Sequence, residues 1–134
     1  MDVVLSMGVM NTHLKSLVNR SRFSQIVDLA KLDIVVVVET WFQPNTSSKL
    51  MNEVFGSKFH WFGRDRKEQK TMHGFGGVGI LVRKQCGEVS LVKDYDNFEA
   101  IWIKFVTSTD ILFVCGSIFH RMKVLEARST FLIV

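Results

Sequence analysis

Residues 33–42 read DIVVVVETWF, a run of β-branched apolar residues that ends at the acidic Glu39. The part from Asp33 to Val38 is short and almost wholly apolar, which is typical of a strand covered on both faces. An unpaired carboxylate in a protein interior is costly, so we expect Glu39 to lie where the strand reaches the surface or where a cation meets it. The stretch therefore predicts a buried strand that ends in an acid at the edge of a sheet.

The preceding residues predict the partner of this strand. Residues 3–10 are β-branched and apolar, which is typical of a strand, and residues 21–32 repeat apolar side chains at helical spacing, with Ser21 as the candidate N-cap. Strand, helix and strand in this order predict a βαβ unit with parallel strands. The carboxyl ends of parallel neighbours meet on one rim of a sheet, so Asn11 and Glu39 are expected to converge there.

The rest of the chain predicts a loop and a short helix after Pro44, and then a series of strands with short connections. These strands are expected at 58–63, 78–83, 88–92, 98–106 and 111–119, and residues 64–76 form a polar, basic loop. The short connections favour antiparallel hairpins. The class is therefore mixed α/β, with a sheet that begins parallel and continues antiparallel. The segment after His120 is poorly patterned and stops on the apolar FLIV, so we expect a chain that is cut short.

Composition and charge bound the functions that the chain can have. The 134 residues, 47% hydrophobic and 22% charged, predict one domain or part of one, and the net charge of +4 permits a polyanionic partner. Cys86 and Cys115 have no CxxC pairing, which predicts free thiols in a reducing compartment. We see no secretory signal and no run long enough to cross a bilayer. The sequence predicts a soluble intracellular protein, nuclear or cytoplasmic and not secreted, without a membrane partner.

The Asn11 and Glu39 pair offers oxygen donors only, one amide and one carboxylate. That chemistry suits Mg²⁺, which binds few protein carboxylates and keeps water and phosphate as its other ligands. The alternative is that Glu39 meets solvent and that Asn11 is a turn residue. The residues by themselves leave both interpretations open.

Several segments carry a resemblance to one family. Residues 11–41 resemble the start of the endonuclease/exonuclease/phosphatase superfamily, and in particular the endonuclease domain that precedes the reverse transcriptase in LINE-like non-LTR retrotransposons. Further matching segments follow in the same order: GRDR at 63–66, GGVGILVRK at 76–84, FEAIWIKF at 98–105 and ILFVCGSIF at 111–119. The likeness covers residues 3–120, and residues 121–134 diverge. It implies that residues 1–134 form part of a four-layered α/β sandwich of the DNase I-like type, truncated, with a mixed parallel and antiparallel sheet.

The resemblance also implies roles for individual residues. Asn11 resembles the family's asparagine at the metal and phosphate site, and Glu39 resembles its metal-ligating glutamate, so both are candidate catalytic and metal-binding residues for Mg²⁺. Arg64 and Arg66, together with the neighbouring Lys67, fall in a stretch that resembles a DNA-contacting loop. An exposed charged turn is the alternative for this stretch, and it stays open.

The departures from the family pattern bear on activity. Phe119 stands where the family has a tyrosine that contacts the scissile phosphate, and phenylalanine has no hydrogen-bond donor. The Gly-Asp-x-Asn and Ser-Asp-His motifs, which carry further catalytic groups, are absent from the sequence. We therefore expect a DNA endonuclease domain of retrotransposon origin with little or no activity as this chain alone. Two alternatives remain: an inactive nucleic-acid-binding remnant, and a fragment of another phosphodiesterase or phosphatase of the superfamily.

Other motifs have plainer interpretations. Residues 74–79 satisfy G-x-G-x-x-G, but the pattern opens a strand instead of a helix, so the glycines are expected to permit a tight turn and close packing. The tryptophans are expected to pack in or against the core, and base stacking by Trp61, beside the basic loop, is the alternative at that position. The histidines share no metal-ligand spacing, and each is expected to be at the surface or to have its hydrogen bonds satisfied.

Overall fold

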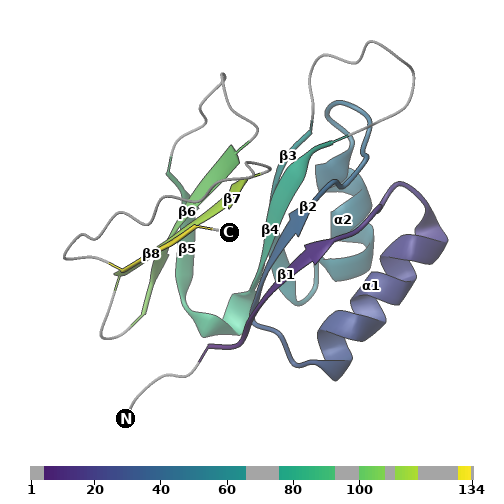
Figure 1. The fold of residues 1–134 in the computed structure, drawn as a ribbon. Helices are drawn as coiled ribbons and strands as arrows, with labels where there is room; N and C mark the ends of the chain where they lie inside the picture. Colours follow the sequence, from purple (N-terminus) through teal and green to yellow (C-terminus); the bar gives the residue numbers. More distant parts are fainter. Residues whose placement is uncertain (1–4, 66–75, 93–99, 108–110, 118–129, 134) are drawn as a thin grey trace.

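The computed structural model describes residues 5–65, 76–92, 100–107, 111–117 and 130–133. Two four-stranded sheets face each other, and two helices cover the outer face of the first sheet (Figure 1). The first sheet has the order β1-β2-β4-β3 and the second the order β5-β6-β7-β8. The strands are β1 (Met7–Asn11), β2 (Ile34–Val38), β3 (Phe59–Arg64), β4 (Val78–Arg83), β5 (Glu88–Leu91), β6 (Ala100–Val106), β7 (Ile111–Ser117) and β8 (Thr130–Ile133).

The strand directions match the expected mixture. β1 and β2 are parallel, with α1 (Leu17–Leu29) between them in the chain, which confirms the βαβ unit. β4 then runs antiparallel to both β2 and β3. In the second sheet β5, β6 and β7 are antiparallel neighbours, and β8 adds to β7 in parallel. The predicted mixed α/β class is confirmed, and the strands divide between two packed sheets.

The first helix begins earlier than the sequence pattern indicated. Ser16 has an extended backbone, and its hydroxyl oxygen accepts a hydrogen bond from the backbone N–H of Asn19 at 3.2 Å. Ser21 lies inside the helix and is exposed, so the prediction of Ser21 as the N-cap is wrong. The exposed Leu17 and Val18 occupy the first turn, and they hid the helical pattern there.

The four valines of β2 are explained by its two covered faces. Val35 and Val37 pack in the cluster that α1 and α2 (Ser47–Phe55) form with the first sheet. Ile34 and Val36 face the other way, into the cluster between the two sheets, where Ile103 of the second sheet is fully buried. Successive side chains of a strand point to opposite faces, so only an unbroken apolar run can fill both cores.

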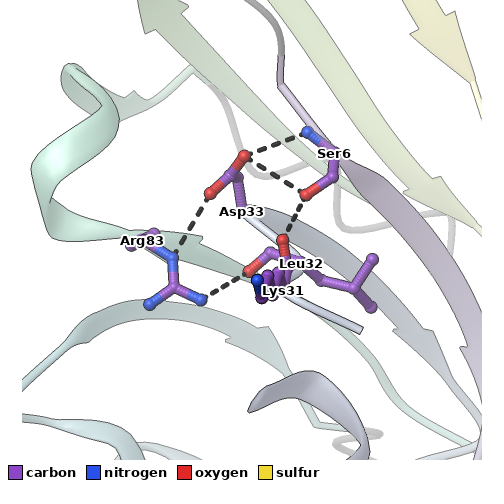
Figure 2. A network of polar contacts seen from close by, with 5 residues as sticks. All are labelled: Ser6, Lys31, Leu32, Asp33 and Arg83. Carbon is purple, nitrogen blue, oxygen red and sulfur yellow. Dashed lines mark hydrogen bonds and ion pairs between the residues drawn. The ribbon is translucent and has the colours of Figure 1, made fainter. Parts of the chain in front are cut away.

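A polar network lies at one end of the first sheet (Figure 2). A carboxylate oxygen of Asp33 accepts hydrogen bonds from the backbone N–H of Ser6 at 3.0 Å and from its hydroxyl at 3.2 Å. The other oxygen pairs with the guanidinium of Arg83 at 3.3 Å, and Arg83 also donates to the carbonyl of Leu32 at 3.0 Å. The network ties the start of β1 to β2 and to the end of β4, at the opposite end of the sheet from Asn11.

Asp33 gives the fold a defined acid sensitivity. Burial acts to raise its pKa, but the hydrogen bonds from Ser6 and Cys86 and the charge of Arg83 together hold the pKa below its ordinary value of 3.8. A carboxylate with a lowered folded-state pKa stabilises the fold above the unfolded-state pKa, and that contribution is lost as pH falls through the folded-state pKa. We expect Asp33→Asn to lower the free energy of unfolding at neutral pH by about 1 kcal/mol and to flatten its decline below pH ~4.

Urea denaturation followed from pH 7 down to pH ~2 measures this effect. Asp28→Asn is the matched control, because Asp28 is exposed on α1 and lies outside the network. Equal acid profiles for the two variants would contradict the assignment.

Cys86 and Cys115 are both free, and burial raises the pKa of the Cys115 thiol to about 11, so it stays protonated and inert. Among the described residues, no helix combines the length and the apolar character that a membrane crossing requires.

Candidate active site

Asn11 and Glu39 lie at the same end of neighbouring parallel strands. Asn11 is the last residue of β1 and pairs in register with Val38, so Glu39 follows directly beside it. The pairing continues past the strands, because the backbone N–H of Thr12 donates to the carbonyl of Val38 at 3.2 Å and that of Leu14 to the carbonyl of Thr40 at 2.9 Å. Asn11 is exposed and Glu39 half-buried. The expected shared rim is therefore present, while the catalytic and metal-binding roles of the two residues stay predictions.

One row of residues crosses the sheet at this rim. Asn11 is in register with Val38, Val38 with Val78, and Val78 with Arg64 at the end of β3. Three strand spacings place the backbones of Asn11 and Arg64 roughly 14 Å apart. Met7 and Phe62 pack in the cluster between the sheets, so the alternation along β1 and β3 turns Asn11 and Arg64 to that same side. Asn11 and Arg64 therefore face the mouth of the sandwich.

Arg64 connects this rim to the second sheet. Its guanidinium donates a hydrogen bond to the carbonyl of Ala100, the first residue of β6, at 3.3 Å. Ala100 pairs in register with Ser117, so β7 ends at the same rim. Arg66, Lys67 and Phe119 were the other predicted site positions, and they lie outside the described residues. The structure thus places one of the three predicted DNA-contacting residues at the rim.

The turn after β2 has an unusual backbone. Glu39 and Trp41 have φ of 56° and 62°, a left-handed conformation that costs a residue other than glycine about 1–2 kcal/mol. The turn is fastened to the glycines before β4, because the N–H of Thr40 donates to Gly77 at 3.4 Å and that of Trp41 to Gly76 at 2.9 Å. Strained backbone of this kind concentrates at functional sites. The glycines therefore hold the segment that carries Glu39.

Close approach explains the glycine at position 77. A Cβ there would lie 2.4 Å from the hydroxyl oxygen of the buried Thr40, and the φ of 90° also disfavours a side chain. β4 begins directly after it, at Val78, so the motif opens a strand as expected. Tight packing by glycine was the sequence interpretation, and it is confirmed at this position.

His13 belongs to this rim, which the sequence analysis missed. Its ring lies 4.5 Å from that of Trp41, tilted by 43°, and its Nε2 atom is buried without a hydrogen-bond partner. The expectation that every histidine is at the surface or satisfied is therefore wrong for His13. A buried unsatisfied nitrogen costs about 1–3 kcal/mol, so it calls for an explanation such as a ligand or water. The available signal was its place two residues after Asn11, on the same face of the extended chain.

Asp65 also has a role that the sequence analysis did not foresee. One carboxylate oxygen accepts hydrogen bonds from the backbone N–H groups of Thr46 and Ser47, both at 3.1 Å, at the start of α2. Thr46 occupies the N-cap position but makes no side-chain cap bond. The GRDR segment therefore combines a helix cap with Arg64 at the rim, because residue 65 follows β3 directly.

The donor set at the rim has the chemistry that Mg²⁺ accepts. Glu39 supplies one carboxylate and Asn11 one amide oxygen, and Mg²⁺ commonly takes one or two protein carboxylates together with water and phosphate. Within the described ranges, no three or more His, Cys, Asp or Glu side chains gather to hold a metal. The residues fit a weakly held ion that needs further ligands.

Solved structures show what this fold is similar to. A humanized TDP2 of D. rerio with 14 mutations matches at a TM-score of 0.58 and 16% identity, over 89% of this chain and 52% of that one. TDP2 of D. rerio also matches in a complex with a single-strand DNA product. The endonuclease domain of TRAS1, a telomere-specific non-LTR retrotransposon, matches at a TM-score of 0.52 and 12% identity, over 84% of this chain and 44% of that one. An endonuclease/exonuclease/phosphatase family protein of Leptotrichia buccalis matches at a TM-score of 0.53 and 7% identity, over 84% of this chain and 53% of that one.

These matches confirm the resemblance at the level of the fold. The chain has the DNase I-like fold of the endonuclease/exonuclease/phosphatase superfamily, and it spans about half the length of the structures that it matches. No protein-family model matches the sequence, and no curated protein matches it.

Proposed function

We propose that this chain carries one half of the active site of a Mg²⁺-dependent endonuclease that hydrolyses phosphodiester bonds of DNA. The row from Asn11 to Arg64, with Glu39 beside it, carries the proposal, because it gathers oxygen donors and a guanidinium at one rim. TDP2, the TRAS1 endonuclease domain and the AP endonuclease of Archaeoglobus fulgidus share this fold, and a TDP2 structure holds DNA. The motifs quoted from residues 11–119 favour a non-LTR retrotransposon origin beside a reverse transcriptase.

Each residue of the rim has a distinct task in this proposal. Glu39 and Asn11 hold the cation, which, when bound, polarises the phosphate and offsets charge on the leaving oxygen. Arg64 turns toward the mouth of the sandwich, where its guanidinium attracts the phosphate backbone. The bond to Ala100 restrains the guanidinium plane, so the charge is held in one place. Arg66 and Lys67 add positive charge in the segment that follows.

This half of an active site does not hydrolyse phosphodiester bonds by itself. Hydrolysis needs a base that takes the proton of the attacking water, and the Gly-Asp-x-Asn and Ser-Asp-His motifs that carry the family's further catalytic groups are absent from the sequence. Loss of members of a catalytic unit costs several orders of magnitude in rate. The chain therefore binds the cation and the phosphate without cleaving, and a nucleic-acid-binding function is what it retains alone.

Glu39 provides the direct test. We expect Glu39→Gln to weaken Mn²⁺ binding, measured by electron paramagnetic resonance as a probe for Mg²⁺, by about tenfold or more. Glu53→Gln is the matched control, since Glu53 is an exposed carboxylate on α2 away from the rim, and it should leave binding unchanged. Equal Mn²⁺ binding by all three proteins contradicts the proposed site.

Plasmid nicking tests the inactivity of the lone half. With Mg²⁺ present, we expect wild type and Glu39→Ala to leave supercoiled plasmid equally intact. Nicking by wild type that Glu39→Ala abolishes would show a complete catalytic site in this chain and overturn that part of the proposal.

A further inference from the structure

A groove between α2 and β3 lies on the helix-covered side of the first sheet, whereas Asn11 and Arg64 turn to the side that faces the second sheet. Its volume is about 480 Å³, within the roughly 300–1,000 Å³ that small-ligand sites occupy. β3 is the edge strand opposite β1 in the order β1-β2-β4-β3. Phe59 in its wall pairs with Arg83 at the end of the sheet where β2 begins, whereas Asn11 lies where β2 ends. The groove is therefore separate from the candidate active site.

The lining of this groove is basic and polar. Lys49 on α2 and Lys84 of η1 (Lys84–Cys86) contribute ammonium groups, with His60 of β3 nearby, and among the described residues no Asp or Glu lines the groove. Lys84 is held in place, because its Nζ donates to the carbonyl of Gly56 at 2.6 Å. Asn52 and Ser48 add uncharged hydrogen-bonding groups. This set favours an anion that also accepts hydrogen bonds.

Trp61 gives the groove a rigid aromatic wall. The indole N–H donates to the hydroxyl of Ser47 at 3.1 Å, and a Cβ at Gly79 would lie 2.0 Å from the ring, so the indole lies directly against the strand. An aromatic ring that is fixed beside cations is the arrangement with which proteins hold single-stranded nucleic acid, by stacking a base while basic side chains meet the backbone.

We propose that the groove lined by Lys49, Trp61 and Lys84 binds the phosphate backbone of a single-stranded nucleic acid, about one or two nucleotides long within the groove. Charge complementarity carries the choice of occupant: the described lining residues include cations and no carboxylate, and the chain as a whole has a net charge of +4. Neither Asn11 nor Glu39 lines the groove, and binding there does not depend on metal binding at the rim.

The test uses a fluorescein-labelled oligothymidylate of about twelve nucleotides and fluorescence anisotropy at low salt. Lys49→Gln with Lys84→Gln is expected to weaken binding by about five- to tenfold and to reduce the salt slope by about 1.4, the contribution of two single-strand phosphate contacts. Arg22→Gln with Lys31→Gln removes the same charge from exposed positions outside the groove and should change affinity by less than about twofold.

A second readout needs no variant at the lysines. The indole N–H resonance of Trp61, assigned by its loss in Trp61→Phe, is expected to shift when unlabelled oligothymidylate is added and not when neutral thymidine is added. Three outcomes would each contradict binding of single-stranded nucleic acid at the groove. They are equal weakening of oligonucleotide binding in the two double variants, unchanged affinity in Lys49→Gln with Lys84→Gln, and a Trp61 resonance that does not shift. The oligonucleotide titrations are made with EDTA and without Mg²⁺, whereas the Mn²⁺ titration of Glu39→Gln reports on the rim alone, so failure of the metal site and failure of the groove are distinguished.

Discussion

Gly79→Ala is expected to lower the free energy of unfolding by about 2–4 kcal/mol, a large effect for the addition of one methyl group. Gly79 is buried in β4, and an added Cβ would lie 2.0 Å and 2.3 Å from two carbons of the Trp61 indole. The ring has to move, which breaks its hydrogen bond to Ser47 and disturbs its edge contact with Phe42. Urea denaturation followed by tryptophan fluorescence measures the loss.

Gly8→Ala is the matched control for this substitution. It places the same methyl group on β1 of the same sheet. The nearest atom there, at 2.8 Å, is the flexible end of the Leu32 side chain. A side-chain tip moves at little cost, and alanine reduces the entropy of the unfolded chain, so we expect a change within about 0.5–1 kcal/mol. Comparable losses in the two variants would contradict the claim that the indole of Trp61 is the obstacle.

Arg20→Ala is expected to lower the free energy of unfolding by about 2–3 kcal/mol and to loosen the rim that holds Asn11. Arg20 is 5% exposed, and one of its guanidinium nitrogens donates to the carbonyls of Leu14 at 2.9 Å and Lys15 at 2.8 Å. Alanine leaves both carbonyls without this donor. Because Leu14 joins the segment after β1 to Thr40, we expect faster hydrogen exchange at the Leu14 amide.

Arg22→Ala separates this effect from helix propensity. Arg22 is exposed on the same helix, so its substitution makes the same change in backbone preference without the two carbonyl contacts, and it should stay within about 0.5 kcal/mol of wild type. If hydrogen exchange at Leu14 is as slow in Arg20→Ala as in Arg22→Ala, Arg20 does not brace the rim.

Much of the fold was predictable because local pattern and tertiary environment agree. β2 is buried on both faces, so its valines had to be continuous, and β4 was predicted with its bounds because the same two-sided burial governs Val78 to Val82. The start of α1 was mispredicted for the converse reason. Leu17 and Val18 are 63% and 60% exposed, so their apolar character carries no information about the buried face.

The candidate site was predictable where it follows from strand order. Asn11 and Glu39 end two apolar segments that are joined by one helix. Because these segments pair in parallel, both residues lie at the same rim of the sheet. Asp65 as the cap of α2 and Arg20 as the brace of residues 14–15 follow no local pattern. Asp65 lies 18 and 19 residues from the backbone groups that it caps, so that contact depends on which loops the packed elements bring together. The partners of Arg20 are only five and six residues away, but the sequence pattern does not mark that contact.

The sequence by itself determined the elements up to β7, the parallel pairing of β1 with β2, and the acid and amide at one edge, because alternation and apolar runs are local properties of the chain. The parallel addition of β8 to β7 and the division into two sheets were not predicted from this pattern. Only the tertiary structure decided which contacts hold that edge in place. It stacks His13 on Trp41, fastens Thr40 to Gly77, directs Arg64 across to Ala100 and lays Trp61 over Gly79. The physical reason is that each of these contacts joins segments from different elements, and their meeting depends on how two sheets and two helices pack.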